Sequence, residues 1–466
     1  MSFSLQKTKR VDPLPASKLS KKVIEFKGGS KTILCIDGGG VRGIVTLHAL
    51  KALEKELKGR CIDIFDMFAG TSTGAIIAGA LAYGVPVDDL IKLYRNNYKK
   101  IFTRSKKRYL LVAAGILTGA ACGFIAGTLK SLSIGIAAGI VVGFLISMGG
   151  IFIERYDNKN MIKILKLLFK DTTLAECHKD IFITGKDTVR GETTYFTAFH
   201  NGKSDIRGTY KDVSLASAIT ASAGSAPTYF RAVGRFIDGG LGSFNNVSYA
   251  APVEALRYSA KKIIKGWVND KGKTDPKGKW PLYYYPEDDN LYKPGKTKVV
   301  SFGTGRKISN MEKGEAMAKR RAWNWLGWII SELMNDASEQ QSYIAEKDLD
   351  KNQSIIEYSR FQLFWSQKSL EVLKDINNEY GLNLKLPKSL RDGTKYNLDA
   401  VKKFNELDQL GVAFGKWLSL SQKKGDPKRF YLKGYISLGH PVISNPARFH
   451  IDIYSKQVKK ELQVVK

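Results

Sequence analysis

The spacing of apolar and polar residues predicts alternating strands and helices from residue 31 onward. Residues 32–36 form a short β-prone run that enters a glycine-rich turn, and Leu47, Leu50, Leu53 and Leu57 then recur at helical spacing. Such alternation is typical of an α/β domain with a central, largely parallel sheet.

Further segments continue this pattern. Residues 61–68 and 232–237 are predicted as strands, and residues 75–83 as a helix rich in small side chains. Residues 266–298 are rich in Lys, Pro, Gly and Asp, which predicts a long surface loop. Residues 1–30 are polar and basic, and we expect them to form a loose N-terminal arm.

The most apolar part of the chain interrupts the first half. Residues 110–129 and 131–153 carry no charge, and Lys130 alone separates them. Each run reaches the roughly 20 residues that a membrane-crossing helix needs. We therefore expect an inserted transmembrane hairpin of two helices over residues 109–153, with its turn at residues 130–133. A hairpin buried in a soluble core is the alternative.

Small residues recur at every fourth position in both runs, which favours close helix packing in lipid and self-association of the chain. Basic residues flank the hairpin and its turn holds one lysine, so the positive-inside rule predicts two crossings with the rest of the chain in the cytoplasm. The small residues are Gly115, Gly119, Gly123 and Gly127, then Gly135, Gly139, Gly143 and Ser147.

The charge is strongly positive, with 74 Lys and Arg against 44 Asp and Glu, a net +30. This balance favours a polyanionic surface, either anionic lipid or nucleic acid. The charge is spread along the chain and no nucleic-acid-binding module is apparent, so we expect lipid rather than nucleic acid. The four cysteines lack the spacing of a metal site and predict free thiols in a reducing compartment.

Gly70-Thr71-Ser72-Thr73-Gly74 lies between a predicted strand and the helix of small residues. A serine at a sharp strand-to-helix turn is exposed at the top of a sheet as a nucleophile. Gly70 and Gly74 relieve crowding on either side, and the amide of Thr73 is a candidate donor to an oxyanion. Ser72 is therefore the predicted nucleophile.

Asp37-Gly38-Gly39-Gly40-Val41-Arg42-Gly43 follows the first predicted strand. It contains G-x-G-x-x-G, so a dinucleotide-binding loop is one interpretation. The other is an oxyanion hole, in which the amides of Gly38, Gly39 and Gly40 point at the charge that develops on a carbonyl oxygen. The nucleophile turn downstream favours the oxyanion hole.

A nucleophilic serine needs a base. None of the five histidines lies in a glycine-flanked turn, although a triad that uses one of them is an alternative. Asp238-Gly239-Gly240 follows a predicted strand, so its carboxylate would emerge at a strand end, where it can accept the serine proton.

Together, the segments 37–43, 70–74 and 238–240 resemble those of the patatin-like phospholipase family. The resemblance extends over residues 31–417, apart from the hydrophobic insertion, and residues 418–466 form a C-terminal extension outside it. It implies a three-layer α/β fold and a dyad of Ser72 as nucleophile and Asp238 as base, without metal or cofactor. The implied substrates are acyl esters of membrane phospholipids, with release of fatty acid. The alternative is a membrane-disrupting or channel-forming protein that acts through the glycine-striped hairpin.

Overall fold

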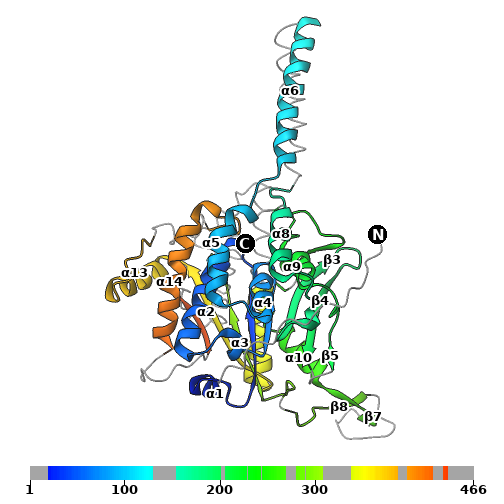
Figure 1. Cartoon of the computed structure of the whole chain (residues 1–466), viewed down its shortest axis with the longest axis vertical. Helices are drawn as coiled ribbons and strands as arrows, with labels where there is room; N and C mark the ends of the chain where they lie inside the picture. The colour runs from blue at the N-terminus through cyan, green and yellow to red at the C-terminus, as the bar shows by residue number, and fades with distance from the viewer. Residues whose placement is uncertain are drawn as a thin grey trace, which may run out of the picture.

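A largely parallel sheet forms the centre of the computed structural model (Figure 1). The model describes residues 19–129, 154–200, 205–227, 229–242, 244–268, 280–288, 290–307, 337–386, 396–422 and 434–438. The ten-stranded sheet has the order β10-β11-β9-β1-β2-β3-β4-β5, with β12 beside β11 and β6 beside β3. The pairs of β4 with β3 and β5 and of β6 with β3 are antiparallel, and the others are parallel.

The strands of this sheet are β1 Lys31–Ile36, β2 Met67–Gly70, β3 Asp180–Asp187, β4 Glu192–His200, β5 Ile206–Arg207, β6 Phe236–Asp238, β9 Thr297–Phe302, β10 Arg306–Lys307, β11 Glu357–Trp365 and β12 Gly434–Leu438. The described α-helices are α1 Lys21–Lys27, α2 Gly43–Leu57, α3 Cys61–Ile64, α4 Thr73–Tyr83, α5 Val87–Ile101, α6 Lys106–Leu129, α8 Lys159–Phe169, α9 Leu215–Ala223, α10 Ala250–Ser259, α13 Gln367–Glu379 and α14 Phe404–Ser421.

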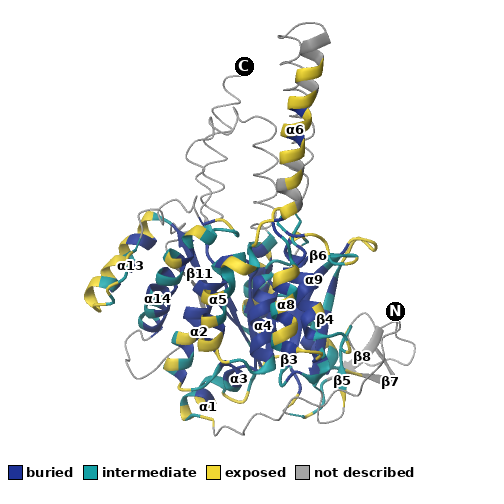
Figure 2. Cartoon of the chain, turned by 45° about the horizontal axis from the view of Figure 1, so that its top comes forward, coloured by how far each residue is buried: buried dark blue, intermediate teal, exposed yellow. Residues whose placement is uncertain are grey.

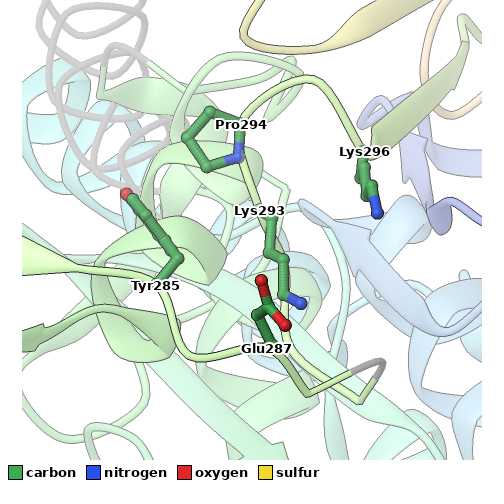
Figure 3. A pocket seen from close by; sticks show the side chains of 5 residues that line it. All are labelled: Tyr285, Glu287, Lys293, Pro294 and Lys296. Atoms are coloured by element: carbon green, nitrogen blue, oxygen red, sulfur yellow. The ribbon is translucent and has the colours of Figure 1, made fainter.

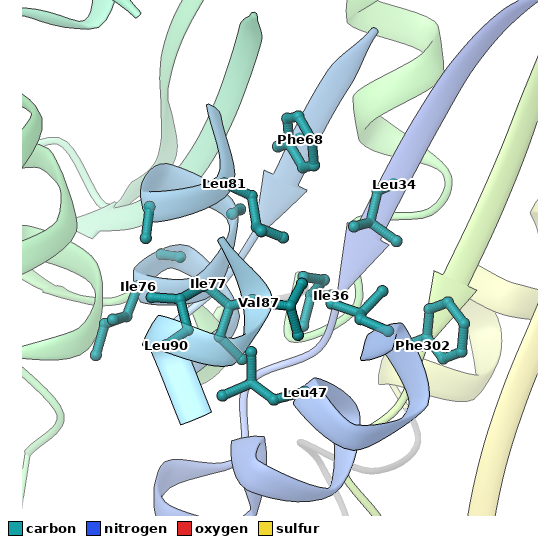
Figure 4. Close-up of a cluster of buried hydrophobic side chains, with 14 of the residues drawn as sticks. Leu34, Ile36, Leu47, Phe68, Ile76, Ile77, Leu81, Val87, Leu90 and Phe302 are labelled. Atoms are coloured by element: carbon teal, nitrogen blue, oxygen red, sulfur yellow. The ribbon is translucent and has the colours of Figure 1, made fainter. Parts of the chain in front are cut away.

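Alternating side chains of the strands point into two cores, one on each face of the sheet. Leu34 and Ile36 of β1 belong to the larger core, together with residues of α2, α4 and α14 (Figure 4). Ile33 and Cys35 belong to the other core, which α10 covers. The described part of the chain is therefore layered as helices, sheet and helix, as the resemblance implies.

Several predicted elements are confirmed, and two predicted strands are wrong in part. Of residues 232–237, only Phe236 and Ile237 lie in a strand, β6. Residues 32–36 lie in β1, the leucine stripe lies on α2, and residues 75–83 lie in α4. Within residues 61–68, however, α3 comes first and β2 begins only at Met67. Asp63 accepts a hydrogen bond from the Arg60 amide at 3.3 Å, so a helix cap determines this segment.

Three other predictions need correction. The predicted loop at residues 266–298 contains the end of β7 Lys261–Val268 and β8 Trp280–Tyr284, which pair antiparallel. The N-terminal arm includes α1, whose Val23 is fully buried, while residues 1–18 lie outside the described residues. In the C-terminal extension β12 pairs with β11, and residues 439–466 lie outside the described part.

α6 stands away from the body of the molecule (Figures 1 and 2). Its side chains include Leu117 and Phe124, which are 71% and 75% exposed. Across the described residues, no helix has both the length and the apolar character that a membrane crossing requires. The expected transmembrane hairpin is therefore not supported. Its turn and its second run fall in residues 130–153, which lie outside the described residues.

Candidate active site

Ser72 lies at a sharp turn between β2 and α4. Its φ of 55° and ψ of −124° fall in a region that residues with a side chain rarely adopt. Two hydrogen bonds fix the turn: the Ser72 amide donates to Ser222 Oγ at 2.8 Å, and Thr71 Oγ1 donates to the Phe244 carbonyl at 2.6 Å. The strand-turn-helix setting that the sequence predicts for Ser72 is therefore present.

Gly74 allows α4 to cross the end of β1 in contact with its backbone. A Cβ at Gly74 would lie 2.2 Å from the Ile36 carbonyl oxygen, so no side chain fits there. This close approach places the start of α4 beside the segment that follows β1. Ser72 and the glycine loop 37–43 are neighbours for this reason.

Asp238 is the last residue of β6 and is 5% exposed. The Gly240 amide donates to Asp238 Oδ1 at 2.8 Å. Burial raises the pKa of Asp238 to about 6, and hydrogen bonds from the Ser72 side chain and the Gly240 amide counteract part of this rise. A carboxylate with a raised pKa is a stronger base that is still ionised at neutral pH.

The glycine loop adjoins Ser72. A Cβ at Gly38 would lie 3.1 Å from Ser72 Cβ, and one at Gly43 would lie 2.8 Å from Thr73 Oγ1. The Gly38 amide donates to the Asn245 carbonyl at 3.2 Å, so this donor is already engaged. Gly40 has a φ of 56°, in the left-handed region that favours glycine.

Two further hydrogen-bond donors lie at this site, the Thr73 amide and Arg42 Nε. Thr73 begins α4, so its amide has no acceptor within the helix. Arg42 Nε donates to the Gly39 carbonyl at 3.3 Å, and burial lowers the pKa of Arg42 to about 10. Arg42 thus supports the shape of the glycine loop from within.

Two of the three described histidines, His48 and His200, lie next to carboxylates other than Asp238, and the amide of the third, His178, donates to the Ala82 carbonyl. His48 Nε2 lies 2.8 Å from Asp408 Oδ1, and His200 Nδ1 lies 2.8 Å from Asp180 Oδ1. Among the described residues, no hydrogen bond joins a histidine to Ser72. His440 and His450 lie outside the described residues.

Sequence reasoning missed several residues that frame the site. Ser222 holds the Ser72 amide. The side-chain oxygen of Asn245 would lie 2.4 Å from a Cβ at Gly38 and 2.9 Å from one at Gly240, so it sits between the glycine loop and the turn after Asp238. Ser222 lies within residues 31–417, over which the sequence resembles the family, and this was the available signal.

Residues 103–105, just before α6, pair with residues 155–158, and we call these two segments the base of α6; they contact the segment that leads to Asp238. The Tyr156 amide donates to the Tyr229 carbonyl at 2.8 Å, and Asn158 Nδ2 donates to the Gly224 carbonyl at 2.9 Å. Gly224 follows directly after α9, the helix that carries Ser222. Only a few residues therefore separate the base of α6 from the partner of the Ser72 amide.

A separate pocket opens at the other end of the strands (Figure 3). It adjoins the start of β9, and Ser72 follows the end of β2; β9, β1 and β2 run parallel. The pocket therefore belongs to a different region from Ser72. Its lining residues are Tyr285, Glu287, Lys293, Pro294 and Lys296.

Comparison with known proteins agrees with this geometry. Residues 34–251 match the family model described as patatin-like phospholipase. Patatin-like protein 2 of Oryza sativa subsp. indica is 28% identical over 321 residues, covering 63% of this chain and 66% of that protein. The 85/88 kDa calcium-independent phospholipase A2 of Rattus norvegicus is 28% identical over 274 residues, covering 58% of this chain and 30% of that protein.

A solved structure, VipD from Legionella pneumophila, covers 81% of this chain and 66% of its own, at 13% identity and a TM-score of 0.28. That score is too low to carry an argument about the fold. The chain spans just under two thirds of the length of the plant relative and under a third of the length of the mammalian one.

Over just under half of its length, at residues 34–251, the chain is thus similar to the patatin-like phospholipase family.

Proposed function

We propose that this chain hydrolyses acyl esters of membrane phospholipids, with Ser72 as nucleophile and Asp238 as general base. One observation carries the proposal: Ser72 occupies a strained turn at the start of α4, and its side chain lies near enough to the buried carboxyl of Asp238 to lower the pKa of that carboxyl. The mammalian relative named as a calcium-independent phospholipase A2 supports phospholipid as the substrate class and a reaction without calcium.

In the proposed reaction, Asp238 accepts the proton of the Ser72 hydroxyl while Oγ attacks the ester carbonyl carbon. Negative charge then develops on the carbonyl oxygen. The amides of Gly39, Gly40 and Thr73 would donate to this oxygen, since the Gly38 amide already donates to Asn245. Asp238 returns its proton to the departing lysolipid oxygen as the ester C–O bond breaks.

The second half-reaction releases the fatty acid. Asp238 takes a proton from water, the resulting hydroxide attacks the acyl carbonyl, and the bond to Ser72 Oγ breaks. The proton on Asp238 then returns to Oγ. A raised pKa suits both halves because the same carboxyl must accept and return a proton near neutral pH.

Fatty acid release from phospholipid vesicles tests this proposal. Ser72→Ala and Asp238→Asn should each lower the rate by at least about 10³-fold, since each removes a group that acts on the reacting atoms. Ser217→Ala, a change of an exposed serine on α9, should keep the wild-type rate. Equal release by the wild type and by Ser72→Ala would contradict the proposal. Chelation of divalent cations should leave the rate unchanged.

We also propose that α6 contacts the lipid surface. Monomeric soluble proteins rarely expose large contiguous apolar patches, and such patches mark sites of contact with protein or lipid. The contacts at the base of α6 would then hold Ser72 near that surface. The exposed apolar side chains of α6 are Leu110, Ile116, Leu117, Phe124 and Ile125.

The same exposed helix favours a second candidate function, disruption of the membrane by α6 itself. Leakage of dye from vesicles separates the two. If lipolysis is the activity, leakage requires Ser72; if α6 disrupts the bilayer, leakage persists in Ser72→Ala. Self-association through the glycine stripe and the cytoplasmic placement of the domain stay predictions.

A further inference from the structure

The glycine loop is held by a residue far along the chain. Asp37, which begins the loop, is 3% exposed, and Arg360 of β11 is fully buried. Arg360 Nη1 donates to Asp37 Oδ1 at 2.7 Å, and Nη2 donates to Oδ2 at 2.6 Å. Such a bidentate pair fixes the orientation of the carboxylate as well as its distance.

The Arg360 guanidinium also hydrogen-bonds a residue of β9, the strand between β11 and β1. Arg360 Nη1 donates to Ser301 Oγ of β9 at 2.7 Å. Because β11 pairs with β9 and β9 pairs with β1, Arg360 reaches Asp37 across one intervening strand. It therefore ties the point where the loop leaves β1 to two other strands of the sheet.

Stability alone is a weak reason for such a pair. Well-packed apolar side chains of similar volume often stabilise a core as well as a buried ion pair or better, because they avoid the cost of removing charge from water. Burial raises the pKa of Asp37, and the positive charge of Arg360 acts against this rise. What the pair adds, and an apolar pair would not, is a fixed direction for Asp37 and the backbone that follows it.

We propose that Arg360 is a positioning residue for the oxyanion hole, acting through Asp37 on the amides of Gly39 and Gly40. This inference rests on the proposed function of Ser72. Arg360 lies outside residues 34–251, the part that matches the family model, so a residue from the C-terminal part of the chain would complete the site.

The proposal predicts a particular kinetic signature. A small displacement of oxyanion donors weakens stabilisation of the transition state and leaves binding of the ground state unchanged. Variants of Arg360 should therefore lose kcat and keep KM. Their affinity for a trifluoromethyl ketone analogue, which forms a tetrahedral oxyanion adduct with the serine, should fall by the same factor as kcat/KM.

A soluble short-chain p-nitrophenyl ester is the substrate for the test, so that binding to lipid surfaces does not enter. We expect Arg360→Lys to lower kcat about 10-fold and Arg360→Met about 100-fold, as for the loss of one oxyanion donor. Asp37→Asn combined with Arg360→Met removes both charges of this buried pair. This double variant should melt near the wild-type temperature, yet its kcat should stay low.

Leu373→Ala is the matched control, since it opens a cavity at a fully buried position of α13 and leaves the glycine loop untouched. It should lower the melting temperature and preserve kcat. Recovery of both melting temperature and kcat in the double variant would overturn the inference, as would a rise in KM that accounts for the whole loss. If the wild-type protein shows no hydrolysis that requires Ser72, that result would instead refute the proposed function.

Discussion

α4 and α6 are both rich in small and apolar residues, yet their surroundings are opposite. Every residue of α4 from Thr73 to Ala82 is buried. On α6, in contrast, Leu117 and Phe124 are largely exposed. Hydrophobic composition therefore predicts that a helix is shielded from water, but the tertiary structure decides whether protein or another surface shields it. For α4 it is the core that supports Ser72, and for α6 we propose that it is lipid.

The strongest test of this comparison replaces one alanine by aspartate in each of the two helices. Ala78→Asp would bury an unpaired carboxylate in α4, because Ala78 is fully buried. We expect this variant to lose at least about 4 kcal/mol of stability, a large fraction of the roughly 5–15 kcal/mol that a typical domain has. Urea denaturation followed by circular dichroism measures the loss.

Ala120→Asp is the matched change in α6, where Ala120 is exposed. It should cost less than about 1 kcal/mol, the difference in helix propensity. Equal losses in the two helices would contradict their assignment to opposite environments.

Asp238 sharpens the comparison, because it is a carboxyl group that is buried in the native protein. Its burial should make the stability of the protein depend on pH. Its pKa in the folded state is about 6, above the ordinary value of 3.8. The folded state therefore binds this proton more tightly than the unfolded state, and stability is lost as pH rises from about 4 to 6. The difference between the two pKa values corresponds to a loss of about 3 kcal/mol in the free energy of unfolding at pH 8.

Asp238→Asn should accordingly raise the free energy of unfolding at pH 8 by up to about 3 kcal/mol and should give little gain at pH 4. Asp212→Asn, at an exposed carboxylate, is the control and should change neither value. The wild-type kcat/KM should fall about tenfold per pH unit below 6, as the base becomes protonated. An activity that stays constant down to pH 4 would rule out Asp238 as the base.

The last prediction tests the proposed lipid contact of α6, where the fold itself should change least. Leu117→Asp with Phe124→Asp should lower the affinity for anionic vesicles, measured by co-sedimentation, about 100-fold or more, since each apolar side chain contributes about 1.5–3 kcal/mol when it leaves water. The melting temperature and the hydrolysis of a soluble ester should not change. Val189→Asp is the control, because Val189 is an exposed apolar residue on the body. Unchanged co-sedimentation of the double variant would remove α6 as the contact.

The sequence predicted those elements whose signal is local. β1, α2 and α4 follow from runs of neighbouring residues, and the turns at Ser72 and Asp238 follow from glycines beside them. The apolar residues at 61–64 resemble a strand, but in the structure they form α3, where Asp63 accepts a hydrogen bond from the Arg60 amide.

Other parts of the site depend on contacts between distant segments and have no local signal. Arg360 meets Asp37 across 323 positions of sequence, and nothing in the residues around Arg360 indicates this partner. Likewise, the side chain of Asn245 lies at Gly38 only because β6 pairs with β3 and brings the following segment back to the loop. The turns that carry Ser72 and Asp238 were therefore predictable, and the residues that hold these turns were not.

Trapping of the acyl-enzyme tests the central claim most directly. The protein is mixed with phospholipid vesicles, quenched in acid during the first turnover, digested, and its peptides are weighed by mass spectrometry. The proposal predicts that the peptide containing Ser72 gains the mass of one fatty acyl group, and that Ser72→Ala shows no such gain on any peptide. Fatty acid release without an acyl group on Ser72, or with one on another residue, would contradict it.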